Sequence, residues 1–215
     1  MAIDDEAEIA LLDQLPAEVQ DKLISGFLFN QFLSKFSDFF RLQKGTNFLG
    51  PSKKDKEGKS TNIYYTWVDQ NYREFMNRLL TNLEPRKDAK HSILVDELDE
   101  FNEISFINNG EVVIGYEINK QRRYCIHFKN KCVIGAYGIT FNKRAAFIYT
   151  ALTAVEGFFI RKNNWLDLLL ISPEIAFIIK KNVLMDYLCK IRLKVMVNKR
   201  KAIEKIQTRH DHQMI

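Results

Sequence analysis

The stretch VIGAYGITFNKRAAFIY, residues 133–149, holds the side chains best suited to binding a small anionic ligand. It combines two glycines with a single arginine, Arg144, within a short segment. Backbone N–H groups at the start of a helix and a guanidinium are donors that bind phosphate. The question is whether the chain binds such a ligand here or retains only the shell of the site.

Other reactive side chains are too scattered for catalysis. The four histidines, His91, His127, His210 and His212, form no pair, and no Ser/His/Asp, Cys/His or nucleoside-triphosphate motif is present. The tail RHDH contains ligand-like side chains, but a frayed terminus explains it more simply. We therefore expect no enzymatic activity and no metal site.

The cysteines exclude a disulfide framework. Cys125, Cys132 and Cys189 are odd in number and show no CxxC spacing, so a zinc site is not indicated either. Cys125 and Cys132 flank a turn and are expected to be small core residues. No apolar run approaches the roughly 18 residues of a membrane span, and the acidic start differs from a secretory signal. These features predict a folded domain in a reducing cytosol.

Helices are predicted on both sides of the candidate site. Residues 11–40 carry apolar side chains at helical spacing and predict a helical hairpin or a pair of short helices. Residues 44–62 are rich in glycine and charge and predict a flexible loop. After the loop, a buried helical face is expected to be formed by Val68, Tyr72, Phe75, Leu79 and Leu83, with Thr61 or Thr66 as a cap.

Between Pro85 and Lys162 the pattern changes to short alternating segments. In EVVIGYEI, the side chains of Val112, Ile114 and Tyr116 share one face with Ile118, as in a half-buried strand. Turn residues at NNG, NKQ and KNK separate the segments. About eight short strands in fewer than 80 residues predict a compact antiparallel roll or barrel, and hence an α+β domain.

Helical character returns after the strands. Asn163 or Asn164 is a candidate cap for a short helix, which Pro173 separates from a long helix over about residues 174–207. The predicted buried stripe of that long helix is Leu184, Leu188, Ile191, Val195, Ala202 and Ile206.

Charge is distributed unevenly along the chain. Residues 1–40 hold eight acidic and two basic side chains, whereas residues 180–209 hold ten basic and two acidic ones. The basic helix VNKRKAIEKIQTRH has the charge to contact RNA or anionic lipid. It lacks interleaved aromatic residues and a nucleic-acid module, so we favour a solvated face or one that docks a neighbouring subunit, and expect no nucleic acid.

Several of these segments resemble the cyclic nucleotide-binding domain family. EISFINNGEVVIGYE is similar to the family's strand–turn–strand around a glycine, here Gly110, and IGAYGITFNKRAAF is similar to its phosphate-binding cassette. NWLDLLLISPEIA resembles the short helix that leads into the lid helix. The resemblance implies an eight-stranded antiparallel β-roll, jelly-roll-like, flanked by helices, with a short irregular piece between strands six and seven.

The upstream segment 11–40 resembles the distal part of the C-linker of voltage-gated channels of the ether-a-go-go, hyperpolarisation-activated and cyclic nucleotide-gated types. The implied organisation is distal C-linker helices at 1–43, a linker loop at 44–62, a cyclic nucleotide-binding-type domain at 63–207 and a tail at 208–215. The resemblance then implies a regulatory, gating domain on the cytoplasmic side of a membrane protein. Its partners would be the pore domain and neighbouring subunits of a homotetrameric, potassium-selective channel used for ion transport.

The cassette departs from the family's pattern. The family has a glycine and a glutamate, then a short helix, then an arginine followed by small residues. Candidate ligand-binding residues here are Gly135, Ala136, Arg144, Ala145, Ala146 and Phe147. Ala136 replaces the glutamate, Phe147 stands where many members have threonine or serine, and the glycine-to-arginine spacing is about one residue short.

These departures predict weak or absent binding of cyclic nucleotide. Losing a charge-assisted hydrogen bond costs roughly 1.5 to 3 kcal/mol, or one to two decades of affinity. We also expect Tyr137, Phe141 and Phe147 to occupy the space that a purine and ribose need. We therefore predict no cofactor, cAMP and cGMP being the candidates. Two other readings stay open: Arg144 as a simple surface arginine, and the chain as a ligand-competent cAMP or cGMP sensor.

Overall fold

The computed structural model describes residue 16 and residues 29–42, 64–66 and 68–213, in two compact units, Met1–Asn82 and Leu83–Ile215. The loop predicted at 44–62, Thr61 and most of the first predicted helix lie outside the described residues. No helix in the described part of the chain is both long and apolar enough to span a membrane.

The first unit contains helices α3 (Phe29–Phe40) and α4 (Gln70–Thr81). Tyr72, Phe75 and Leu79 of α4 are buried, as their spacing predicts. The prediction was wrong for Val68, which is 90% exposed, because the helix begins only at Gln70. Asp69 rather than a threonine is the N-cap residue, and its carboxylate accepts the N–H of Thr66 at 2.8 Å in the preceding turn.

The second unit is a β-roll of two four-stranded antiparallel sheets, with strand orders β1-β8-β3-β6 and β2-β7-β4-β5. The strands are β1 (Glu84–Asp88), β2 (Ile93–Val95), β3 (Glu103–Asn109), β4 (Glu111–Ile118), β5 (Gln121–Lys129), β6 (Cys132–Ile134), β7 (Ile148–Ala151) and β8 (Val155–Arg161). The predicted eight-stranded antiparallel roll and the α+β class are confirmed. The short piece between β6 and β7 is helix α5 (Ala136–Thr140).

Three strand details differ from the sequence-based expectation. β1 was not among the expected segments, because Pro85 and four charged residues hide its period. Of CVIGAY, only Cys132–Ile134 is a strand, since the chain turns into α5. β4 is buried on both faces from Val112 to Tyr116 rather than half-buried, because it is an interior strand against which helix α8 (Leu193–Gln213) also packs.

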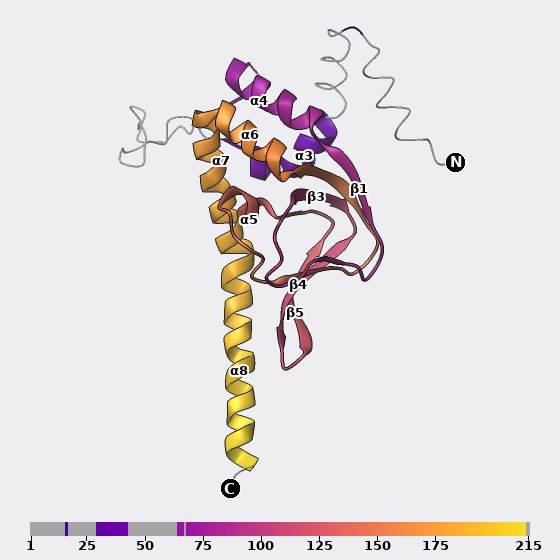
Figure 1. Cartoon of the computed structure of the whole chain (residues 1–215), viewed down its shortest axis with the longest axis vertical. Helices are drawn as coiled ribbons and strands as arrows, with labels where there is room; N and C mark the ends of the chain where they lie inside the picture. The colour runs from indigo at the N-terminus through magenta and orange to yellow at the C-terminus, as the bar shows by residue number, and fades with distance from the viewer. Residues whose placement is uncertain (1–15, 17–28, 43–63, 67, 214–215) are drawn as a thin grey trace, which may run out of the picture. The chain divides into compact units, whose positions relative to one another are not determined.

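Helices α6 (Lys162–Ile171) and α7 (Pro173–Asp186) follow the roll, and α7 continues through a π-helical segment, η2 (Tyr187–Arg192), into α8. Figure 1 shows α7 and α8 as one rod that passes beside the β4–β5 hairpin. Pro173 follows the end of α6 as predicted, but it is itself the first residue of α7, one position before the predicted start. The caps predicted at Asn163 and Asn164 are wrong, since β8 runs directly into α6 and Arg161 is the N-cap residue.

The π-helical segment changes the predicted stripe of the long helix. Ile191, Val195 and Ala202 are buried as expected, but Leu184 is exposed and Val183 is buried in its place. A π turn holds more residues than an α turn, so it rotates the helix on one side relative to the other. A stripe drawn with one constant period therefore fails across residues 187–192.

The β3–β4 turn requires glycine. Gly110 has φ +95°, and a Cβ there would lie 2.4 Å from the carbonyl oxygen of Ala154 and 2.9 Å from Cα of Val155. Since both are backbone atoms, neither can move cheaply. We expect Gly110→Ala to lower the free energy of unfolding by about 2 to 4 kcal/mol, measured by urea denaturation.

The β4–β5 turn offers the opposite substitution as a control. Asn119 and Lys120 both have positive φ, at 52° and 62°, so Lys120→Gly relieves a strained backbone. It is expected to raise the free energy of unfolding by about 1 kcal/mol. Equal effects of the two substitutions would contradict this account of the turns.

Candidate functional site

The cassette begins with a glycine that the backbone demands. Gly135 has φ +86° and is the N-cap residue of α5, and its carbonyl oxygen accepts the N–H of Ile139 at 2.9 Å. A Cβ there would lie 2.5 Å from the carbonyl oxygen of Glu103 on β3. The position predicted from the sequence is thus a left-handed turn between β6 and α5.

Helix α5 offers no acidic side chain. Ala136, where the family pattern has a glutamate, is buried, and the other residues of α5 are Tyr137, Gly138, Ile139 and Thr140. Gly138 packs so closely that a Cβ would meet the ring of Phe101 at 2.1 Å. Gly138 was not singled out from the sequence, since nothing local predicts this contact.

Arg144 lies on the surface rather than against α5. Its Nη2 donates to Oε1 of Glu100 at 3.0 Å, and the two side chains are 66% and 61% exposed. Together with Lys143 and Lys162, these residues line a hollow of about 120 Å³. The guanidinium therefore has a carboxylate partner already and faces an outer hollow.

The residues after Arg144 anchor the end of the cassette. Ala145 is buried, its N–H donates to the carbonyl of Asp99 at 2.9 Å, and its own carbonyl accepts from Leu98 at 2.8 Å. Ala146 is exposed. The two small residues thus have different surroundings, and only Ala145 is held by the β2–β3 loop.

Aromatic rings join the cassette to the C-terminal helices. The rings of Tyr137 and Tyr187 stack with centroids 3.9 Å apart and an interplanar angle of 2°. Phe147 is 3% exposed, and its ring centroid lies 6.5 Å from that of Tyr187. The ring centroids of Phe141 and Tyr137 lie 5.3 Å apart. Burial, and secondarily the nearby Tyr137, raise the pKa of Tyr187. Three of these rings were expected to fill the pocket, but the sequence did not point to Tyr187.

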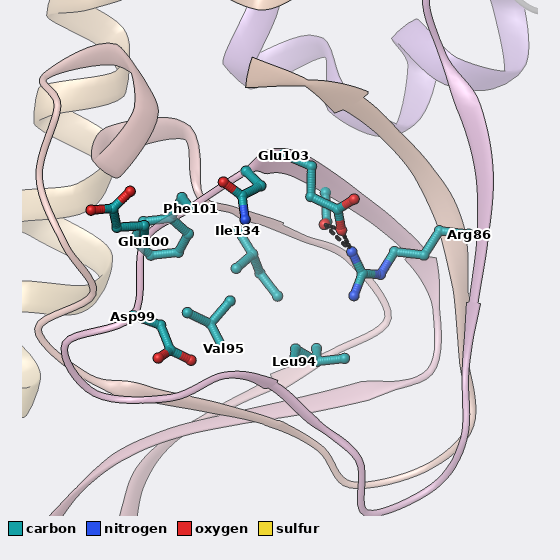
Figure 2. A pocket seen from close by; sticks show the side chains of 10 residues that line it. Arg86, Leu94, Val95, Asp99, Glu100, Phe101, Glu103 and Ile134 are labelled. Carbon is teal, nitrogen blue, oxygen red and sulfur yellow. Dashed lines mark hydrogen bonds and ion pairs between the residues drawn. The ribbon is translucent and has the colours of Figure 1, made fainter. Parts of the chain in front are cut away.

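A cavity of about 340 Å³ lies between the two sheets of the roll (Figure 2). β2 contributes Leu94 and Val95, and the β2–β3 loop contributes Asp99, Glu100, Phe101 and Asn102, while the remaining lining residues are Arg86, Glu103, Ser105 and Ile134. Three acidic residues and one arginine thus line the cavity, but Glu100 is paired with Arg144 at the outer hollow and Glu103 is paired with Arg86. The lining guanidinium already has a carboxylate partner, which does not favour a phosphate.

Arg86 is the centre of a polar cluster in this cavity. It forms ion pairs with Asp88 and Glu103, and its Nη1 donates to Oγ of Ser105 at 2.9 Å. These residues were not predicted from the sequence. The available signal was their i, i+2 spacing, which places Arg86 with Asp88, and Glu103 with Ser105, on one face of each strand.

The thiols and carboxylates offer no metal centre within the described residues, where no group of three or more His, Cys, Asp or Glu is arranged for one. Cys125 and Cys132 are only partly buried, so the prediction of core residues holds in part. Loss of hydration raises the pKa of Cys132 to about 12, and its thiol stays protonated near neutral pH.

Comparison with known proteins shows likeness to solved structures only. No family model matches the chain, and no curated protein matches it. The regulatory domain of Toxoplasma gondii PKA with cAMP is 15% identical, with a TM-score of 0.42, over 44% of this chain and 36% of that one.

Two bacterial structures are also similar. The N-terminal domain of a transcriptional regulator from Streptomyces coelicolor is 19% identical, with a TM-score of 0.44, over 51% of this chain and 77% of that one. A Geobacter metallireducens protein to which cyclic nucleotide binding is ascribed is 12% identical, with a TM-score of 0.48, over 58% and 94%. Such distant matches carry no argument about ligand or function.

The strand order identifies the fold. Two sheets ordered β1-β8-β3-β6 and β2-β7-β4-β5, a short helix between β6 and β7, and helices after β8 make the β-roll of cyclic nucleotide-binding domains. The resemblance drawn from the sequence is confirmed at the level of this fold. None of the three structures above is described as a channel, so membership of a channel is a proposal.

Proposed function

We propose that this chain is a regulatory domain with a cyclic nucleotide-binding β-roll that works without a bound cyclic nucleotide. The observation that carries the proposal is the stack of Tyr137 on Tyr187, which joins the cassette helix to the C-terminal helices through the protein's own rings. In this proposal the stack takes the place of a diffusible ligand as the link between roll and helix.

The cassette residues support the same proposal. A cyclic nucleotide needs a partner for its ribose hydroxyl and cations for its phosphate, yet Ala136 has no carboxylate and Arg144 is paired with Glu100. In the neighbouring cavity the guanidinium of Arg86 is likewise already paired, with Asp88 and Glu103. We infer weak or absent binding of cAMP and cGMP, and a role in binding or transmitting force rather than in catalysis.

The larger protein that we propose is a homotetrameric, voltage-gated, potassium-selective channel, with this chain as a gating domain on its cytoplasmic side. The support is the resemblance of residues 11–40 to a distal C-linker. Its partners would be the pore domain and neighbouring subunits.

Calorimetric titration tests the ligand-independent part of the proposal. The 215-residue chain is expected to show no saturable heat with cAMP or cGMP up to about 1 mM, which corresponds to a binding free energy weaker than about −4 kcal/mol. Arg144→Ala is the matched variant and should give the same flat titration. Micromolar binding that Arg144→Ala abolishes would overturn the proposal in favour of the cAMP or cGMP sensor.

The coding sequence upstream tests the channel separately. We expect six membrane spans and a pore loop before residue 1. A full-length gene that encodes no membrane span would reject the channel while leaving the titration result unaffected.

A further inference from the structure

Helix α8 carries a second apolar stripe that the sequence analysis did not predict. Its members are exposed to solvent: Leu193 is 59% exposed, Met196 and Val197 are each 52% exposed, and Ile203 is 41% exposed. At 100° per residue these four side chains fall within an arc of about 120°. We call them the outer stripe.

The outer stripe lies opposite the face of α8 that packs on the roll. Val195 and Ala202, which are 0% and 8% exposed, define the packed face. Lys199 lies at its edge, 3.8 Å from a carboxylate oxygen of Glu97 and above the ring of Tyr116. The helix is therefore already fixed to the roll by one face, and the outer stripe is available to another partner.

Basic side chains border the outer stripe. Residues 190–204 hold six lysines and arginines and one acidic residue, Glu204. Lys194 and Lys201 lie along one border and Arg200 lies within the arc, and all three are exposed. None of these three forms an ion pair with any residue that the structure describes.

This combination selects the chemistry of the partner. A second copy of α8 would bring its own cations against Arg200 and Lys201, which opposes pairing of two outer stripes. An RNA-binding surface would need aromatic residues for stacking, and the outer stripe is aliphatic. Aliphatic side chains bordered by lysines match an anionic bilayer surface, where the stripe enters the interface and the lysines reach the headgroups.

We propose that the outer stripe and its basic border bind an anionic lipid surface, with α8 lying along the interface. The roll would remain on the aqueous side, because it packs against the opposite face of the helix. The inference rests neither on the cassette nor on membership of a channel.

Sedimentation with lipid vesicles tests the proposal on the full chain. We expect binding to phosphatidylcholine vesicles that contain about one third phosphatidylserine, and little binding to pure phosphatidylcholine. Raising NaCl to about 0.5 M should release most of the protein, because the lysines act through screened charge. Binding that is equal on both vesicle types, or absent from both, would overturn the proposal.

Paired variants separate the two parts of the surface. Lys194→Gln with Lys201→Gln should weaken binding about 25-fold, from roughly fivefold per basic residue. Leu193→Gln with Met196→Gln should weaken it at least tenfold and retain the salt dependence. Circular dichroism establishes that each variant keeps its helix.

Matched controls change the same residue types elsewhere. Lys90→Gln with Lys129→Gln removes two exposed lysines from the roll, and Leu170→Gln replaces an exposed leucine of α6. These variants should bind vesicles like the original chain. Equal weakening by the controls would show general charge attraction and overturn the assignment to α8. Binding of an acidic helical peptide at the outer stripe without any vesicle binding would also overturn it.

Discussion

Replacing Trp165 with alanine is expected to lower the free energy of unfolding of the second unit by about 4 kcal/mol. Trp165 is fully buried on α6, and its indole N–H donates to Oγ1 of Thr140 on α5 at 3.0 Å. The substitution leaves a cavity and removes the bond that ties α6 to the cassette helix. Urea unfolding followed by circular dichroism measures the loss. Tryptophan fluorescence is unsuitable, because the only tryptophan left in the variant, Trp67, lies outside the second unit.

Two smaller substitutions separate packing from hydrogen bonding at this position. Trp165→Phe keeps most of the buried area, and Thr140→Val keeps the shape but leaves the indole N–H without this acceptor, at a cost of about 1 to 3 kcal/mol. The double variant should cost less than the sum of the two, because both single changes break the same bond. Additive costs would show that the contact between Trp165 and Thr140 contributes nothing.

The roll was predictable because local sequence patterns, the alternation of apolar residues and the turn residues, mark its strands. Turn residues at Gly110, Asn119 and Asn130 all have positive φ, and they bound the strands that the alternation predicts. β1 was missed for a physical reason: as an edge strand beside β8 it needs no apolar alternation. Its Arg86 pairs with Glu103 inside the roll, and its Glu84 pairs with Arg161 on the surface. The strand conformation of β1 depends on tertiary contacts, which a local hydrophobic period does not reveal.

The helices show the same limit. The buried stripe after the π-helical segment was predictable from spacing, whereas Leu184 was placed on the wrong face because the turn widens at residues 187–192. Exposure is also a tertiary property. Residues of the outer stripe, such as Met196, are apolar and helical in sequence, and only the position of the roll shows that they face solvent.

For the candidate site, the residue types were predictable, but the directions in which the side chains point were not. The sequence predicted a glycine, a short helix and an arginine, and Gly135 does precede α5, but the partner of Arg144 is Glu100, 44 residues away. The cluster around Arg86 joins two strands that are distant in sequence, β1 and β3, in the same way. Long-range polar partners depend on the register of the sheets, which the spacing of single residues does not contain.

Removing the ring of Tyr187 is expected to loosen the cassette without unfolding the roll. Tyr187→Ala should destabilise the packing of α5 against the C-terminal helices by about 2 kcal/mol, because it loses a stacked contact and half-buried aromatic area. Amides of the cassette helix, such as those of Ile139 and Phe141, should then exchange with solvent about 30-fold faster. Hydrogen exchange read by mass spectrometry or NMR measures this effect directly.

The comparison that decides the role of the stack is between variants of similar size change. Tyr187→Phe keeps the ring and should leave exchange of the cassette amides unchanged. Tyr124→Ala removes a partly exposed ring whose hydroxyl lies within hydrogen-bond distance, 3.0 Å, of Oγ1 of Thr150. Both residues belong to the β2-β7-β4-β5 sheet, so this substitution should affect only its own surroundings. Faster exchange in Tyr187→Ala alone would mean that an internal ring stack holds the cassette against the C-terminal helices. Unchanged exchange would mean that the hydrogen bond from Trp165 and the close contact of Gly138 with Phe101 are sufficient to hold α5 in place. The ring stack would then be a consequence of the fold and would not be what fixes the cassette to the C-terminal helices.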